Sequence, residues 1–115
     1  MSYKEYRRYR ERMNKRILST ENRDTKRFFS LDTATYRDGV LSGKNKELLG
    51  LVASAVLRCN DCILYHLDRC IKEGYSNEEL YEALNVALVV GGSIIIPHLR
   101  YAYDMMDELR TLEKE

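Results

Sequence analysis

An all-α fold is predicted by the amino-acid sequence, and three observations support this prediction. Apolar residues recur at spacings of three and four along most of the 115 residues, as on the buried face of a helix. Gly74 and the segment Ser76-Asn77-Glu78-Glu79 are typical of one helix ending and another beginning with a capping box. No segment alternates apolar and polar residues as a half-buried strand would. We therefore expect helices joined by short connections.

The first predicted helix covers about residues 3–18 and belongs to a basic arm, which we delimit as residues 1–27. Its apolar side chains form one thin stripe that suits docking against another helix or subunit: Tyr3, Tyr6, Tyr9, Met13 and Ile17. Residues 1–28 hold ten Lys/Arg and four Asp/Glu, whereas residues 29–115 hold nine and fourteen. An acidic body would repel phosphates, so we expect the arm to pack on acidic protein surface and to bind no nucleic acid.

Residues 28–115 are predicted to form one helical domain. Polar residues between 19 and 24 interrupt the first helix, and the stretch from Phe28 to Val40 is predicted as a short helix or loop. Further helices are expected from about Lys44, from about Cys59 to Glu73, from Ser76 to a break at Gly91-Gly92, and then to about Leu112. Pro97 either kinks the last helix or lies in its first turn.

Cysteine content and hydropathy predict a cytoplasmic protein that does not span a membrane. The stretch 1–17 lacks the apolar segment of a signal peptide. The longest apolar runs, 48–57 and 86–90, are shorter than the roughly 20 residues that a membrane helix needs. Three cysteines, an odd number, argue against a secreted disulfide framework. In a reducing compartment, a CxxC pair is typical of catalysis or metal binding.

Cys59, Cys62 and His66 bring thiol chemistry to the start of one predicted helix. Cys62 and His66 are four residues apart and lie on the same helix face. Cys59 lies at the N-terminal end, where the helix dipole stabilises a thiolate and where the second sulfur is within disulfide reach. His66 can accept a thiol proton or stabilise the anion. These are the groups that a two-electron thiol–disulfide cycle requires.

Glu47 is a carboxylate near the start of the preceding helix, on a stretch that is otherwise mostly apolar or basic. If that helix packs against the cysteine helix, Glu47 reaches His66, fixes the imidazole tautomer and raises its basicity. The candidate catalytic residues are therefore Cys62, Cys59, His66 and Glu47.

The spacing of these residues resembles the E-x11-C-x-x-C-x3-H signature of the AhpD-like alkylhydroperoxidases, in the carboxymuconolactone decarboxylase superfamily. The flanking residues agree with it: Asp38-Gly39 before Lys46-Glu47-Leu48, Cys62-Ile63 before Tyr65-His66, and Glu82-Ala83-Leu84 before Gly91-Gly92. The resemblance covers about residues 28–110. A lone CxxC is a weak signal, but the spacing among the glutamate, the two cysteines and the histidine, together with the flanking residues, is a specific one.

This resemblance implies an AhpD-like helical bundle that assembles as a homo-oligomer, a trimer or hexamer. It also implies peroxidase and disulfide-reductase activity on a hydroperoxide or disulfide substrate, with an external dithiol as reductant, and we expect no metal or organic cofactor. Cys62 would be the attacking thiol, Cys59 the thiol that closes the disulfide, and Glu47 with His66 the proton relay. The question of which cysteine is the nucleophile stays open, because the first cysteine attacks in other CxxC proteins.

Asp61 departs from the family pattern, because the best-known members carry a histidine directly before the second cysteine. An acidic group beside the thiols raises their pKa, which favours disulfide exchange over rapid peroxide turnover. His98 and Tyr65 are further candidates close to the site. His98 could instead cap a helix, and Tyr65 could pack in the core or at a subunit contact.

Three other interpretations use the same residues. A zinc site of Cys59, Cys62, His66 and Cys70 is disfavoured, because Cys62 and Cys70 would lie about 12 Å apart along one helix; Cys70 is expected to be a small buried residue. Glu47 and His66 could serve a cofactor-free acid–base enzyme acting on a small carbonyl or lactone, although the decarboxylating branches of the family lack the CxxC. The chain could also be an interaction module that binds a partner through its arm.

Overall fold

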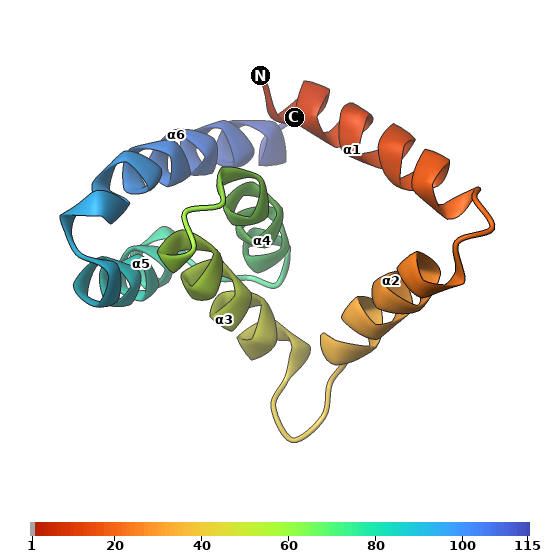
Figure 1. Ribbon diagram of the computed structural model, residues 1–115. Helices are drawn as coiled ribbons and strands as arrows, with labels where there is room; N and C mark the ends of the chain where they lie inside the picture. The colour runs from red at the N-terminus through yellow and green to blue at the C-terminus, as the bar shows by residue number, and fades with distance from the viewer. Residues whose placement is uncertain (1) are drawn as a thin grey trace. The chain divides into compact units, whose positions relative to one another are not determined.

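The computed structural model describes residues 2–115, and its regular structure is entirely helical (Figure 1). None of these described residues forms a strand, so the all-α prediction is confirmed. The elements in chain order are α1 (Tyr3–Leu18), α2 (Arg23–Thr35), α3 (Gly43–Val56), α4 (Asn60–Lys72), α5 (Asn77–Gly91), the short 3₁₀ helix η1 (Ser93–Ile95) and α6 (Ile96–Glu113).

The chain divides into two compact units, the first ending at Arg37 and the second beginning at Asp38. The first unit holds α1 and α2. α2 begins earlier than predicted, because Asn22 is its cap: the side-chain oxygen of Asn22 accepts a hydrogen bond from the backbone N–H of Thr25, 3.2 Å away. The polar residues that we interpreted as an interruption therefore start a helix, since Asn is favoured both in turns and at helix caps.

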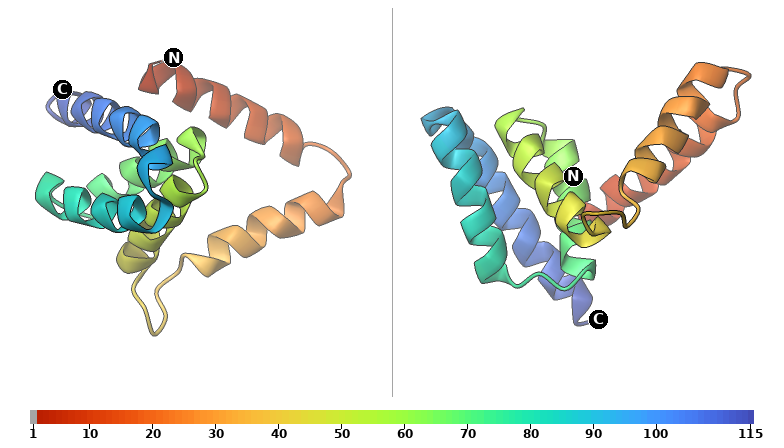
Figure 2. Two further views of the ribbon diagram at one scale, coloured as in Figure 1. Left: turned by 60° about the vertical axis from the view of Figure 1, so that its left-hand side comes forward. Right: turned by 90° about the horizontal axis from the view of Figure 1, so that it is seen from below.

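The second unit holds α3 to α6, which Figure 2 shows from two further sides. α3 packs against α4 and α5, and α4 also packs against α6. The largest side chains that this unit buries completely are apolar: Leu51, Ile63, Leu64, Leu67, Cys70, Leu80, Leu84, Ile95 and Met106. Burial of such side chains is the main contribution that holds the four helices together.

The predicted ends of the helices within the second unit are mostly confirmed. Gly74 has a φ of 97°, the left-handed conformation expected after α4. Ser76 and Glu79 form the expected capping box at the start of α5, with bonds of 3.1 and 2.9 Å. Pro97 lies in the first turn of α6, where its missing N–H costs no helical hydrogen bond, and so it does not kink the helix.

Tyr75, in the connection between α4 and α5, ties three parts of this unit together. Its hydroxyl contacts the carbonyl of Lys44 and the side-chain oxygen of Asn45 in the first turn of α3, at 3.3 and 3.1 Å. Its own carbonyl accepts a hydrogen bond of 2.7 Å from Arg110 on α6. The first turn of α3, one turn before Glu47, is thereby held in place. Within residues 2–115, no helix combines the length and the apolar character that crossing a bilayer requires.

Candidate active site

The turn between α3 and α4 places the two cysteines at a helix start. The N–H of Cys59 donates to the carbonyl of Ser54, and the N–H of Arg58 donates to that of Ala55, each at 3.0 Å. This is the Schellman pattern, and Arg58 takes the left-handed position, with φ at 60°, that usually belongs to glycine. Cys59 is then the N-cap of α4, where its Sγ accepts from the N–H of Cys62 at 3.3 Å.

Cys59 and Cys62 form a disulfide across the first turn of α4, with their Cα atoms 5.3 Å apart. Cys62 is exposed, whereas Cys59 is half-buried. A thiolate or substrate arriving from solvent therefore reaches Cys62 more easily than Cys59. Rate and selectivity in thiol–disulfide exchange depend on this accessibility.

The structure brings Glu47 of α3 to His66 of α4. Glu47 Oε2 lies 2.9 Å from His66 Nδ1, and the two residues are only 4% and 8% exposed. When the imidazole is neutral, its Nδ1–H donates to the carboxylate and leaves a lone pair on Nε2. His66 lies one turn after Cys62 on the same helix face, so this arrangement suits a base for the thiol.

Gly50 explains how the two helices come close enough for this contact. A Cβ added to Gly50 would lie 2.6 to 2.9 Å from three ring atoms of His66. Any larger residue at position 50 would therefore press on the imidazole. In the sequence Gly50 is a glycine within an apolar stretch, and its partner depends on how α3 and α4 pack.

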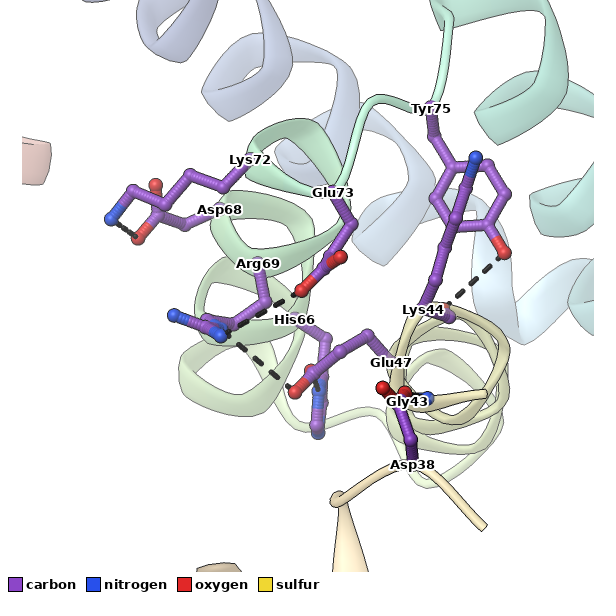
Figure 3. A network of polar contacts seen from close by, with 10 residues as sticks. All are labelled: Asp38, Gly43, Lys44, Glu47, His66, Asp68, Arg69, Lys72, Glu73 and Tyr75. Atoms are coloured by element: carbon purple, nitrogen blue, oxygen red, sulfur yellow. Dashed lines mark hydrogen bonds and ion pairs between the residues drawn. The ribbon is translucent and has the colours of Figure 1, made fainter. Parts of the chain in front are cut away.

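Arg69 also belongs to this site and was missed from the sequence (Figure 3). Its Nε lies 3.9 Å from Glu47 Oε1, and its Nη2 lies 4.0 Å from Glu73 Oε1. Within residues 2–115, Arg69 Nε is a buried nitrogen without a hydrogen-bond partner. The one signal in the sequence was its place three residues after His66, on the same side of the helix.

His98, on α6, contacts the start of the cysteine helix. Its Nδ1 is 2.7 Å from the side-chain oxygen of Asn60, the residue after Cys59. Because an amide oxygen only accepts, His98 Nδ1 carries the hydrogen. His98 thus ties α6 to the first residue of α4 and stays half-buried.

Asp61 and Tyr65, the two remaining candidates, lie on the same helix as the cysteines. Asp61 is exposed, and its charge helps burial to raise the pKa of Tyr101 on α6. The ring of Tyr65 meets that of His66 edge-on, with centroids 5.1 Å apart.

Cys70 lies in the core behind the site and is a free thiol. Burial, helped by the carboxylates of Glu47 and Glu73, raises the pKa of Cys70 to about 12. A thiol that stays protonated is a poor nucleophile and a poor metal ligand. Across residues 2–115, no three His, Cys, Asp or Glu side chains gather in a way that could hold a metal ion.

Comparison with known proteins places this geometry in one family. Residues 25–104 match the carboxymuconolactone decarboxylase family. A crystal structure of a Thermotoga maritima protein is 59% identical, covers 97% of this chain and 98% of its own, and superposes with a TM-score of 0.93. A second crystal structure of that protein, 57% identical with a TM-score of 0.91, covers 96% of this chain and 93% of its own; it is described as a family member with a suggested role in an antioxidative response.

More distant relatives agree. A family member from Legionella pneumophila, crystallised in its apo form, is 25% identical, covers 93% of this chain and 96% of its own, and has a TM-score of 0.69. An uncharacterised protein of the cox locus of Paracoccus denitrificans is 29% identical over 82 residues, which are 71% of this chain and 74% of that protein. The chain belongs to the carboxymuconolactone decarboxylase family and carries the AhpD-like arrangement of glutamate, paired cysteines and histidine.

Proposed function

We propose that this protein is a thiol–disulfide oxidoreductase that also reduces hydroperoxides, with Cys62 and Cys59 as its redox pair and Glu47 and His66 as its proton relay. The observation that carries the proposal is the buried 2.9 Å contact between Glu47 of α3 and His66 of α4, because α4 is the helix whose first turn holds the disulfide. The suggested antioxidative role of the Thermotoga maritima protein supports the same direction.

The reductive half of the cycle begins from the disulfide. A thiolate of an external dithiol attacks the sulfur of Cys62, the more exposed of the two cysteines, and Cys59 leaves as a thiolate. The second thiol of the reductant then attacks the mixed disulfide and releases Cys62. Two electrons pass to the protein, which now holds two thiols, and the reductant leaves as a disulfide.

The oxidative half uses His66 as the base. His66 Nε2 takes the proton of the Cys62 thiol, and the thiolate attacks one oxygen of a hydroperoxide, so that the O–O bond breaks. The alkoxide leaves as an alcohol with the proton from His66, and Cys62 becomes a sulfenic acid. The Cys59 thiol condenses with it, releasing water and restoring the disulfide. With a disulfide substrate, the Cys62 thiolate instead forms a mixed disulfide and releases one thiol, and Cys59 then attacks Cys62 and releases the second thiol.

Stopped-flow kinetics on the reduced protein test this mechanism. Cys62→Ser is expected to abolish reaction with hydrogen peroxide and with a small aromatic disulfide, because it removes the attacking sulfur. Cys59→Ser should still consume one equivalent and stop at a sulfenic acid or mixed disulfide that mass spectrometry detects. Cys70→Ala is the matched control and should react like wild type. Equal rates for Cys62→Ser and wild type would exclude Cys62 as the nucleophile.

A second function fits the same Glu47–His66 pair, because a buried carboxylate and imidazole also suit acid–base chemistry on a small carbonyl or lactone. Turnover of such a substrate by the Cys59→Ser/Cys62→Ser double variant would favour it. An interaction module would differ again: removing residues 1–26 would abolish its binding and leave thiol reactivity intact.

Homo-oligomerisation, as a trimer or hexamer, is part of the proposal. α2 buries none of its side chains, and Phe28 and Leu31 on one side of it are 67% and 63% exposed. Val86, Val89 and Val90 at the end of α5 are exposed as well. Apolar groups of this kind are typical of surfaces that pack against another chain. We place the protein in the cytoplasm, where reducing partners would recycle the cysteine pair.

A further inference from the structure

Arg69 stands between two carboxylates at the back of the proposed proton relay. Figure 3 shows its guanidinium directed toward Glu47 on one side and Glu73 on the other, and the two N···O distances are 3.9 and 4.0 Å. Neither distance is that of a hydrogen bond. Arg69 therefore acts on Glu47 through its charge.

The carboxylate of Glu47 is divided between two neighbours. Its Oε2 contacts His66 Nδ1 at 2.9 Å, while its Oε1 faces Arg69. A carboxylate that is 4% exposed keeps its charge only if positive charge or hydrogen bonds compensate the lost hydration. Without Arg69, His66 is the group in contact with Glu47 that could supply that positive charge, through protonation.

We propose that Arg69 is a positioning residue that balances the Glu47 charge and so lets His66 rest as a neutral imidazole. This inference rests on the proposed function, in which His66 must accept a proton. With Arg69 present, its positive charge offsets the negative charge of Glu47. His66 Nε2 then keeps the lone pair that accepts the Cys62 proton. After the transfer, the positive charge of the imidazolium and the negative charge of the Cys62 thiolate balance each other, so the proton transfer leaves the net charge of the site unchanged.

Other charged groups face the same cluster and limit which variants are informative. Glu73 shares Arg69 from the next turn of α4, and the buried Cys70 thiol lies close enough for Glu47 and Glu73 to raise its pKa. Lys72 lies on the same helix but pairs with Asp68 at 3.0 Å. Lys72→Gln therefore removes one positive charge from α4 without touching Glu47, and it is the matched control.

The experiment compares Arg69→Gln, Arg69→Lys and Lys72→Gln with wild type. ¹⁵N spectra of the imidazole in the disulfide form, at neutral pH, report how many ring nitrogens of His66 are protonated. Wild type, Lys72→Gln and Arg69→Lys are expected to show one protonated nitrogen, and Arg69→Gln two. In the reduced proteins, Arg69→Gln should slow thiol–disulfide exchange on the order of tenfold, a part of the roughly 10²–10⁴-fold that a general base contributes.

Two outcomes would overturn the inference: an unchanged His66 spectrum in Arg69→Gln, or failure of Arg69→Lys to restore it. Circular dichroism and thermal melts check that the variants are folded. If Arg69→Gln is unfolded, Arg69→Met provides a second side chain without charge. The ¹⁵N result does not depend on turnover. If Cys62→Ser and wild type react equally while Arg69→Gln still protonates His66, the proposed function fails and the role of Arg69 stands.

Discussion

The three cysteines share one helix, or its cap, but have different chemical surroundings. Cys59 and Cys62 lie at the first turn of α4, where solvent and the helix dipole reach them, whereas Cys70 lies two turns later in the core. The same helix thus leaves Cys62 exposed for reaction and keeps Cys70 buried and unreactive. Position along the helix decides which is which.

Cys70 gives a stability prediction at alkaline pH. Its pKa is raised from 9.0 to about 12 in the folded protein, so above pH 9 the unfolded chain releases a proton that the folded chain keeps. The free energy of unfolding should therefore fall, by up to about 1.4 kcal/mol per pH unit, between pH 9 and about 12. Urea unfolding of wild type and Cys70→Ala across this range measures it.

The Cys70→Ala protein should lose less stability as the pH rises, because it lacks the titrating thiol. Parallel curves for the two proteins would show that Cys70 ionises as easily in the folded state as in the unfolded one. Alkylation of the reduced native protein is an independent check, with Cys59 and Cys62 modified and Cys70 left free.

Individual residues differ in how far the sequence could assign them. Cys62 and His66 are four apart on one helix, so their shared face follows from helix geometry alone. Arg69 has the same kind of spacing, but its importance comes from Glu47, which lies on another helix. Nothing in the sequence states which of the many Arg and Lys side chains meets a buried carboxylate.

At the scale of the helices, Gly50 controls how closely α3 and α4 approach each other. Gly50→Ala adds a Cβ that overlaps the His66 ring, so the ring or the helix must shift. The gain in helix propensity, up to about 1 kcal/mol, should be outweighed by overpacking of about 1–3 kcal/mol. We expect a net loss of about 1 kcal/mol in denaturant unfolding, together with slower reaction of Cys62 in stopped-flow kinetics.

Gly39→Ala is the control for this variant, since its added Cβ would meet only Lys46 Nζ, at an ordinary 3.6 Å. It should leave the reaction of Cys62 unchanged. If Gly50→Ala reacts as fast as wild type, the spacing of α3 and α4 does not limit the base.

The helices themselves were predictable because their ends carry strong local signals. Ser76 with Glu79 and the left-handed Gly74 mark the boundary of α4 and α5 in the sequence as in the structure. α2 was harder, because Asn22 serves equally well in a turn or as a cap. The turn at Arg58 carried no signal at all, since a left-handed arginine cannot be distinguished from any other arginine in a sequence.

Assembly belongs to the scale of the whole molecule. An oligomer is expected in light scattering at micromolar concentration, because α2 and the end of α5 leave apolar side chains exposed; the family resemblance implies a trimer or hexamer. Val89→Lys, on α5, should shift the mass toward the monomer, since it places a charge where another chain would pack. Val40→Lys, in the connection before α3, is the matched control and should keep the mass of wild type.

A monomeric wild-type protein would contradict this prediction, and an oligomer that tolerates Val89→Lys would move the interface away from α5. The division of the chain into an arm of residues 1–27 and a domain of residues 28–115 stays a prediction. The packing itself divides between Arg37 and Asp38, so that α2 belongs with α1.

The N–H of Cys59 makes the hydrogen bond that closes the end of α3, and its side chain accepts the hydrogen bond that caps the start of α4. One residue therefore serves both helices, and the turn between them is as short as these bonds allow. A residue inserted there would break this pair of hydrogen bonds and change where α4 begins relative to α3, which would carry the imidazole away from its carboxylate. Descendants of this chain can therefore vary the turn by substitution but not by length.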